Sequence, residues 1–214
     1  MNLVKPLIAS ISGGTLATGA YLTRDHWMPL KEKEFKSISD ALKGRTLISS
    51  LKGDALTKQW EAEFESDKDA IKELLGDSTL EKQQGGVKLS EWCASKMSLD
   101  VNENQSVFKN VEKYCLIRNV ASQLIRNKKT LLGAGQDTDW KSTYDKRKNT
   151  SAKREDIGLT DSNWNGKTET EDLPKVKSWC ASNSGGDFLA SQEGENSLYT
   201  KVLKWCTKEG ATEN

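Results

Sequence analysis

The residues in this chain that are best suited to chemistry are four cysteines, which form two matching pairs. The tetrapeptide Trp92-Cys93-Ala94-Ser95 returns unchanged at residues 179 to 182, and the segments that end at Cys115 and Cys206 also match. This spacing favours one disulfide within each copy, Cys93 to Cys115 and Cys180 to Cys206, in an oxidising compartment. Four cysteines permit three pairings, and four reduced, buried cysteines are the alternative. The wide spacing argues against a zinc site, so no metal is expected.

Acid and base chemistry has few candidates. The only histidine, His26, stands beside Trp27, just after an uncharged N-terminal stretch that could meet a membrane, and we expect it to be an interfacial or loop residue. A histidine-dependent triad within the body is therefore excluded. The acidic run Glu61, Glu63, Glu65, Asp67, Asp69 is expected to form a solvated helix face. A carboxylate-dependent hydrolase is the enzymatic alternative, although the second copy has no equivalent acid pair.

The matching cysteine segments belong to a longer duplication. Leu51, Gly53, Trp60 and Phe64 keep the same mutual spacing as Leu131, Gly133, Trp140 and Tyr144. We therefore predict two tandem repeat units, at residues 51–130 and 131–214. The aromatic residues that recur in both units are the predicted structural core: Trp60, Phe64, Trp92, Tyr114, Trp140, Tyr144, Trp179 and Trp205.

Apolar residues recur at helical spacing in both units, which predicts an all-α fold with three helices per unit. The expected helices cover residues 54–75, 87–98 and 105–126 in the first unit, and 136–148, 173–182 and 196–208 in the second. Pro174 is expected in the first turn of its helix. A short turn after Ser98 would fold two helices into an antiparallel hairpin and bring Cys93 towards Cys115.

The N-terminal residues differ from the rest. Residues 6–22 carry no charge, follow Lys5 and precede Arg24. As a helix this stretch would reach ~26 Å, at ~1.5 Å per residue. It predicts a signal segment or membrane anchor at 1–23, followed by a stalk or extra helix at 24–50. The charge bias favours an extracellular body, anchored or secreted. The alternative is a buried or disordered N-terminal helix.

The overall charge of the chain does not indicate a binding partner. The 214 residues include 32 basic and 31 acidic side chains, so the net field gives no general attraction to nucleic acid. No nucleic-acid partner is expected, and no motif for a cofactor is present. The glycine pairs indicate turns rather than a phosphate-binding loop. The sequence does not predict an enzyme.

One region is locally basic. Between Arg126 and Arg154 there are nine basic residues and three acidic ones. A polyanion-binding surface is therefore an alternative function, with a patch formed by Lys128, Lys129, Lys146, Arg147 and Lys148. The aromatic residues in this region, Trp140 and Tyr144, match Trp60 and Phe64 and are expected to be core rather than stacking platforms.

The whole pattern resembles a known group of proteins. A leading hydrophobic segment, the Trp92-Cys93 and Trp179-Cys180 helices, and the later Lys113-Tyr114-Cys115 and Lys204-Trp205-Cys206 segments are similar to paralogous families of uncharacterised proteins in haemotropic mycoplasmas. These wall-less bacteria attach to red cells. The resemblance covers nearly the whole chain and implies surface exposure, contact with a host-cell surface molecule, or antigenic display.

Overall fold

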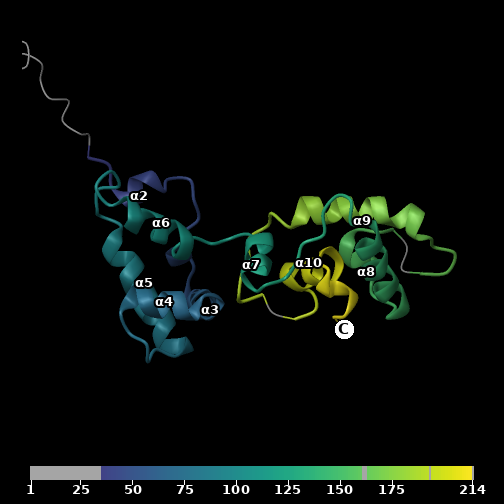
Figure 1. Cartoon of the computed structure of the whole chain (residues 1–214), viewed down its shortest axis with the longest axis horizontal. Coiled ribbons are helices and arrows are strands. Elements are labelled where there is room, and N and C mark those ends of the chain that lie inside the picture. Colours follow the sequence, from purple (N-terminus) through teal and green to yellow (C-terminus); the bar gives the residue numbers. More distant parts are fainter. Residues whose placement is uncertain (1–34, 161–162, 193, 214) are drawn as a thin grey trace, which may run out of the picture. The chain divides into compact units, whose positions relative to one another are not determined.

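A computed structural model describes residues 35–160, 163–192 and 194–213 (Figure 1). It divides the chain into Met1–Lys36, of which only the last two residues are described, and a compact unit, Ser37–Asn214. Within the described residues the structure contains nine α-helices, three short 3₁₀ helices and no β-strand, which confirms the all-α prediction. The predicted membrane or signal segment at 1–23 lies outside the described residues, and so does His26.

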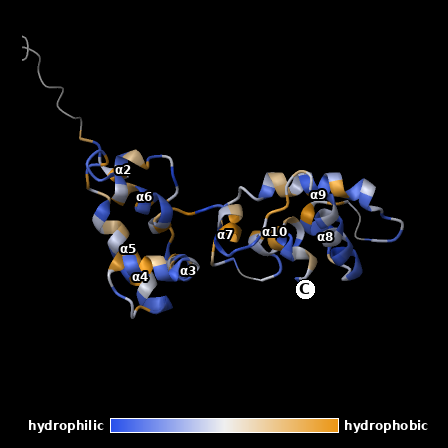
Figure 2. Cartoon of the chain, viewed as in Figure 1, coloured by the Kyte–Doolittle hydropathy of each residue, from blue (hydrophilic) through white to orange (hydrophobic). Residues whose placement is uncertain are grey.

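The helices of the described part mix hydrophilic and hydrophobic residues around their surfaces (Figure 2). None of these helices combines the length and the apolar composition that a bilayer crossing requires. Among the described residues, three large apolar side chains are exposed: Phe35, which precedes the first helix, Val87 in the helix Lys82–Lys96, and Ile125 in the helix Val120–Arg126.

The first half of the compact unit contains six helices around one apolar core. They are α2 (Ile38–Ala41), η1 (Ile48–Ser50), α3 (Gly53–Ser66), α4 (Lys68–Leu75), α5 (Lys82–Lys96) and α6 (Gln105–Tyr114). Ile38 of α2, its C-cap residue Leu42, and Ile48 of η1 belong to this core and are almost fully buried. Residues 37–50 are thus an integral part of the first half.

The second half has its own core. Its helices are α7 (Val120–Arg126), α8 (Asp137–Asn149), η2 (Arg154–Ile157), α9 (Glu169–Asn183), α10 (Leu198–Cys206) and η3 (Glu209–Ala211). Val120, Leu124 and Val202 are among its fully buried residues. The predicted helices of the two units correspond to α3, α5 and α6, and to α8, α9 and α10, and each half contains further helices.

Two of the expected helices are interrupted. The helix predicted at 54–75 breaks at Asp67, whose backbone leaves the helical region with φ −150° and ψ 45°. The helix predicted at 105–126 ends at Cys115, because the chain pairs there with residues 46–48 through the Leu47–Leu116 bridge. A new helix, α7, then begins after Asn119, whose side chain accepts a hydrogen bond from the Ser122 N–H as an N-cap.

The position of Pro174 also differs from the prediction. Helix α9 begins at Glu169, so Pro174 lies inside the helix rather than in its first turn. The first turn contains Glu169, Glu171 and Asp172, and acidic side chains stabilise a helix N-terminus through the helix dipole. This acidic turn extends the helix on the N-terminal side of the proline, which forfeits one backbone hydrogen bond.

The two halves contain backbone contacts at corresponding sequence positions. The Ile38 N–H donates to the Leu99 carbonyl at 2.9 Å, and the Val120 N–H donates to the Gly186 carbonyl at 2.8 Å. Each half also contains two isolated bridges, Ser37–Asp100 and Leu47–Leu116 in the first and Asn119–Asp187 and Leu131–Thr207 in the second. In each half these contacts fasten the start of the half to the helix pair that carries its cysteines.

Candidate functional sites

The cysteines form two disulfides, Cys93–Cys115 and Cys180–Cys206, which is the predicted pairing. The first joins α5 to the end of α6, and the second joins α9 to α10. All four cysteines are buried. Of the predicted core aromatics, six are buried (Trp60, Phe64, Tyr114, Trp140, Tyr144 and Trp205), while Trp92 and Trp179 are partly buried.

An apolar cavity lies beside each disulfide. The first, of about 430 Å³, is lined by Trp60, Cys93 and Cys115 together with Leu56 and Met97. The second, of about 380 Å³, is lined by the corresponding Trp140, Cys180 and Cys206, with Leu131 and Lys177 among its other residues. Both volumes fall in the range of small-molecule pockets. These cavities are therefore a matched pair of candidate sites.

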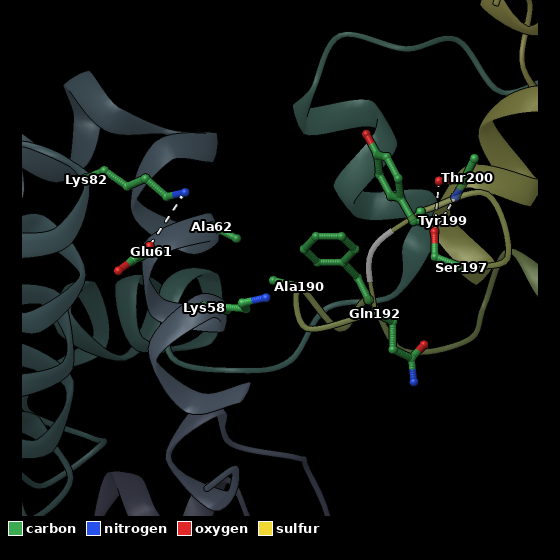
Figure 3. Close-up of a pocket in the computed structure, with 11 residues that line it drawn as sticks. Lys58, Glu61, Ala62, Lys82, Ala190, Gln192, Ser197, Tyr199 and Thr200 are labelled. Atoms are coloured by element: carbon green, nitrogen blue, oxygen red, sulfur yellow. Dashed lines mark hydrogen bonds and ion pairs between the residues drawn. The ribbon is translucent and has the colours of Figure 1, made fainter. Parts of the chain in front are cut away.

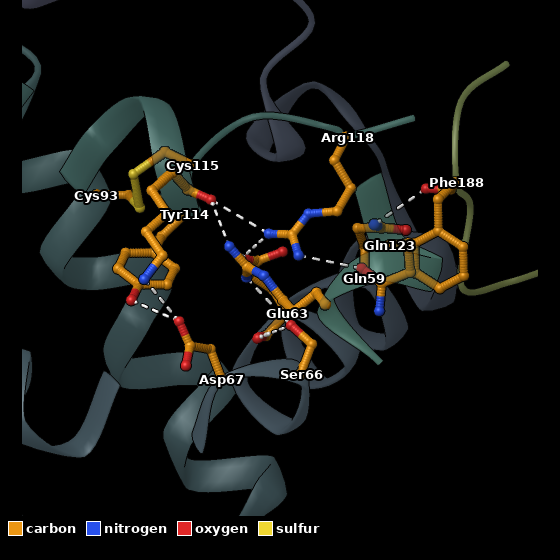
Figure 4. Close-up of polar contacts among 12 residues, drawn as sticks. Gln59, Glu63, Ser66, Asp67, Cys93, Tyr114, Cys115, Arg118, Gln123 and Phe188 are labelled. Carbon is orange, nitrogen blue, oxygen red and sulfur yellow. Dashed lines mark hydrogen bonds and ion pairs between the residues drawn. A yellow bond between two sulfur atoms is a disulfide. The ribbon is translucent and has the colours of Figure 1, made fainter. Parts of the chain in front are cut away.

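The first half also contains a buried carboxylate between two arginines (Figure 4). Glu63 is 2% exposed, although the sequence suggested a solvated position for it. It accepts hydrogen bonds from Arg118 and, at 2.7 Å, from Nη1 of Arg126. Burial raises the pKa of the Glu63 carboxyl, against the opposing effect of the two guanidinium groups. Both arginines also donate to the Lys113 carbonyl, so the cluster ties α3 to α6 and α7.

Three of the other acids of this run have separate basic partners. Glu61 lies 3.5 Å from Lys82, and Glu65 lies 3.7 Å from Lys68. Asp67 accepts hydrogen bonds from Lys113 Nζ at 2.8 Å and from the Tyr114 hydroxyl at 2.9 Å, as Figure 4 shows for the tyrosine. The run thus divides among several ion pairs on α3 and its C-terminal end.

A buried glutamine links the halves. Gln59 on α3 donates from Nε2 to the Phe188 carbonyl at 3.1 Å, and its Oε1 accepts from the Ala190 N–H at 2.8 Å. A further hydrogen bond holds the loop that contains Phe188, because the Phe188 N–H donates to the Arg118 carbonyl at 2.9 Å. The segment between α9 and α10 is therefore fastened to the first half by backbone contacts that do not depend on its own side chains.

A cavity of about 310 Å³ lies next to this link (Figure 3). The first half contributes Lys58, Ala62 and the Glu61–Lys82 ion pair. The second half contributes an aromatic pair, Phe188 and Tyr199, with ring centroids 5.3 Å apart, and the hydroxyls of Ser197 and Thr200. Charged groups, hydroxyls and an aromatic face together suit a polar ligand or a polar segment of a partner.

The basic segment does not present its charges as one exposed set. Several of its residues bind acceptors within the chain: Arg126 binds Glu63, Lys129 binds Glu213, Lys141 binds Asp145 and Glu169, Lys148 binds the Lys167 carbonyl, and Arg154 binds Asp172. Of the predicted patch, Arg147 is 2% exposed, whereas Lys128, Lys129, Lys146 and Lys148 retain exposure. The sequence predicts a surface position for Arg147 because lysines surround it, whereas the structure buries this side chain.

Within the described residues, no group of three or more His, Cys, Asp and Glu side chains is arranged to hold a metal ion. Comparisons with family models, with curated proteins and with solved structures found no match to this chain.

Proposed function

We propose that this chain is a surface protein of the cell envelope, anchored or secreted through residues 1–23, whose body contacts host molecules or serves in antigenic display. The observation that carries this proposal is that all four cysteines form disulfides, one in each half. Structural disulfides persist in oxidising compartments and are rare in the cytosol. The resemblance to paralogous families of haemotropic mycoplasmas, which implies surface exposure, supports the same location.

In this proposal the body consists of two tandem copies of one unit. The corresponding backbone contacts support this view, and they extend each copy upstream of the boundaries predicted at residues 51 and 131. The copies would then begin at Ser37 and Asn119, each of which caps a short helix with its side chain. A duplicated unit with two disulfides is suited to durability outside the cell, since each bond constrains its own copy.

The first test is the state of the thiols in native cells. Intact-mass measurement and non-reducing peptide mapping are expected to recover the Cys93–Cys115 and Cys180–Cys206 peptides, because the body would fold in an oxidising compartment. The same mass reports whether the N-terminal segment is retained. Four free thiols in protein taken directly from cells would contradict the export of the body.

The second test is protease accessibility on intact cells. A protease added outside is expected to degrade the body, while a cytosolic protein of the same cells stays intact as the control for lysis. Reduction before digestion should accelerate cleavage, because the disulfides restrain both halves. Complete protection of the body on intact cells would reject surface display.

The cavity next to Gln59 is the contact surface that we favour, because both halves contribute polar groups and it contains an aromatic pair. Ala62→Trp would fill this cavity from α3, whereas Ala94→Trp, on α5, alters the apolar cavity beside the first disulfide. Adhesion of the full chain to host red cells should fall with Ala62→Trp and persist with Ala94→Trp. Equal adhesion of both variants would assign contact to another surface.

Polyanion binding through residues 126–154 is the second candidate function, favoured by the exposure that Lys128, Lys146 and Lys148 retain. Retention of the full chain on heparin at low salt, lost by combined Lys128→Gln, Lys146→Gln and Lys148→Gln substitution, would support it. Elution of the unaltered chain without retention would reject it.

A further inference from the structure

Arg147 is a buried cation whose hydrogen bonding is incomplete. It is 2% exposed, and its Nη2 donates to the carbonyls of Glu213 and, at 2.9 Å, Gly210. Across the described part of the chain, its Nε is the one buried side-chain nitrogen or oxygen without a hydrogen-bond partner. Burial lowers the pKa of the Arg147 guanidinium, and the opposing effects of Glu195 and Glu213 do not restore it. A buried charge in this situation is costly unless a counter-charge is supplied.

Arg147 lines a cavity of about 320 Å³ in which basic groups predominate. The cavity has four cationic side chains, Arg147, Lys153, Lys201 and Lys204, and two carboxylates, Asp156 and Glu195. The formal excess is therefore two positive charges. Hydroxyls of Thr150 and Ser151 and the amide of Asn196 also line it, and they add neutral hydrogen-bonding groups.

The carboxylates of this cavity neutralise only part of its charge. Lys201 lies 3.3 Å from Asp156, and Lys204 pairs with Glu195, whose side chain is 77% exposed. Such an exposed carboxylate is well solvated and contributes little to compensating a buried cation. Within the residues that the structure describes, Lys153 forms no ion pair. An added anion would therefore neutralise Lys153 and Arg147.

The first half has a carboxylate at the sequence position that Arg147 occupies in the second half. Asp67 stands three residues after Phe64, as Arg147 stands three residues after Tyr144. The Asp67 carboxylate accepts hydrogen bonds from Lys113 and Tyr114, whose counterparts before the second disulfide are Lys204 and Trp205. The second half therefore keeps the lysine of this arrangement, replaces the internal carboxylate with an arginine, and has a cavity beside it.

The turn that closes α8 adds to the cavity. Ser151 has a left-handed backbone, with φ 50°, which is uncommon for a residue other than glycine. The turn is held because the Ala152 N–H donates to the Arg147 carbonyl at 2.9 Å and the Ser151 N–H to the Lys148 carbonyl at 3.1 Å. This conformation places Thr150 and Ser151 in the wall of the cavity, next to Arg147.

We propose that this cavity binds a phosphate group, either free phosphate or the phosphate of a small monoester. The phosphate would take the electrostatic role that the Asp67 carboxylate has in the first half, accept hydrogen bonds from the lysines and the Ser151 hydroxyl, and compensate Arg147. Hydrogen bonds between cations and phosphate oxygens are short and strong, and several donors converge in this cavity. Phosphate binding in this cavity does not depend on where the protein is located.

The test is calorimetric titration of the full chain with inorganic phosphate, in a chloride buffer of fixed ionic strength. One phosphate per chain is expected to bind saturably. Lys204→Gln should weaken the affinity by about tenfold or more, because it removes a charged donor. The matched control is Lys113→Gln, which removes the corresponding lysine of the first half and should leave phosphate affinity unchanged. Lys153→Gln is a second variant whose lysine is outside any ion pair that the fold uses, and it should weaken binding too.

Glucose 6-phosphate, with glucose as its control, distinguishes the two sources of the phosphate. Tighter binding of glucose 6-phosphate than of phosphate, with no binding of glucose, would identify a monoester site, and equal affinities would identify a site for free phosphate. The proposal is overturned by the absence of saturable phosphate binding. It is equally overturned if Lys204→Gln and Lys153→Gln bind phosphate as the unaltered chain does, or if Lys113→Gln weakens binding as much as they do.

Discussion

One pair of corresponding sequence positions forms an apolar contact in the first half and a polar contact in the second. In the first half Phe64 lies against Gly85, so closely that a Cβ on the glycine would come within 2.3 Å of the ring. In the second half Tyr144 and Asp172 occupy the corresponding positions, and the tyrosine hydroxyl donates to Asp172 Oδ2 at 2.8 Å. Arg154 pairs with the same carboxylate, and this group is almost fully buried.

The comparison teaches that matching sequence positions can contribute to either of two kinds of interior. The first half achieves close approach of α3 and α5 by omitting a side chain, at Gly85 and again at Gly86. At the corresponding sequence positions the second half has a hydrogen-bonded ion pair. Apolar contacts tolerate partial loss, whereas a buried ion pair leaves an uncompensated charge when one partner is removed. The two halves should therefore respond differently to equivalent substitutions.

The largest effect is expected from Asp172→Ala. It would leave Arg154, whose Nη2 donates to Asp172 Oδ1 at 3.0 Å, as an unpaired buried cation. Removal of one partner of a buried pair costs about 3–5 kcal/mol, which urea unfolding of the full chain would measure. Glu169→Ala, which removes an exposed partner of Lys141, is the control and should cost less than ~1 kcal/mol. Equal losses from both substitutions would contradict the difference drawn between buried and exposed pairs.

Removal of either disulfide is expected to have the next largest effect. The two bonds span 22 and 26 residues, so the chain-entropy model gives each about 3 kcal/mol. The Cys93→Ala, Cys115→Ala double variant and the Cys180→Ala, Cys206→Ala double variant should therefore lose nearly equal free energies of unfolding. A clear inequality would show that one half depends more on its disulfide than loop length explains.

A smaller loss is expected from Gly85→Ala. The added methyl group would overlap the Phe64 ring, and overpacking of a core costs about 1–3 kcal/mol. The gain in helix propensity, about 1 kcal/mol, offsets part of this cost. Gly185→Ala is the control, since a Cβ there meets no atom within 4 Å. Adding Phe64→Leu to Gly85→Ala should recover stability, and its failure to do so would rule out the ring as the source of the loss.

The smallest expected effect is a dependence of the unfolding free energy on pH in the acidic range. Burial raises the pKa of Asp172, but hydrogen bonds from Arg154 and Tyr144 outweigh burial and hold it below the usual 3.8. A depressed pKa contributes stability that is present above the unfolded value and is lost as pH falls through the folded pKa. The difference in unfolding free energy between the unaltered chain and Asp172→Asn should thus be constant above about pH 5 and shrink below about pH 4. A difference that grows as pH falls would contradict this assignment.

The sequence predicted those features that depend on local spacing. Cys93 and Cys115 repeat as Cys180 and Cys206 within helical patterns, so both the pairing and the all-α class could be predicted. Recurrence also identified Trp60 as a core residue, because a side chain kept at the same spacing from its neighbours in both copies marks a packing position.

Features that depend on distant partners could not be predicted. Glu63 is buried by Arg118 and Arg126, which lie 55 and 63 residues further along the chain. A single acidic residue in an acidic run carries no local signal of such partners. The break at Asp67 has the same origin, since Lys113 and Tyr114 bind its carboxylate from α6. The burial of Arg147 could not be predicted for the same reason, because the carbonyls that it binds belong to residues 210 and 213.

The two disulfides also have a mechanical consequence. A protein held at one end and bound at the other is pulled along its chain, and tension follows the shortest covalent path. The bonds bypass spans of 22 and 26 residues, which at ~3.4 Å per residue withhold ~160 Å from the stretched length. Under load, the loops between the bonded cysteines, which contain α6 and α10, would therefore stay closed after the rest of the chain had extended.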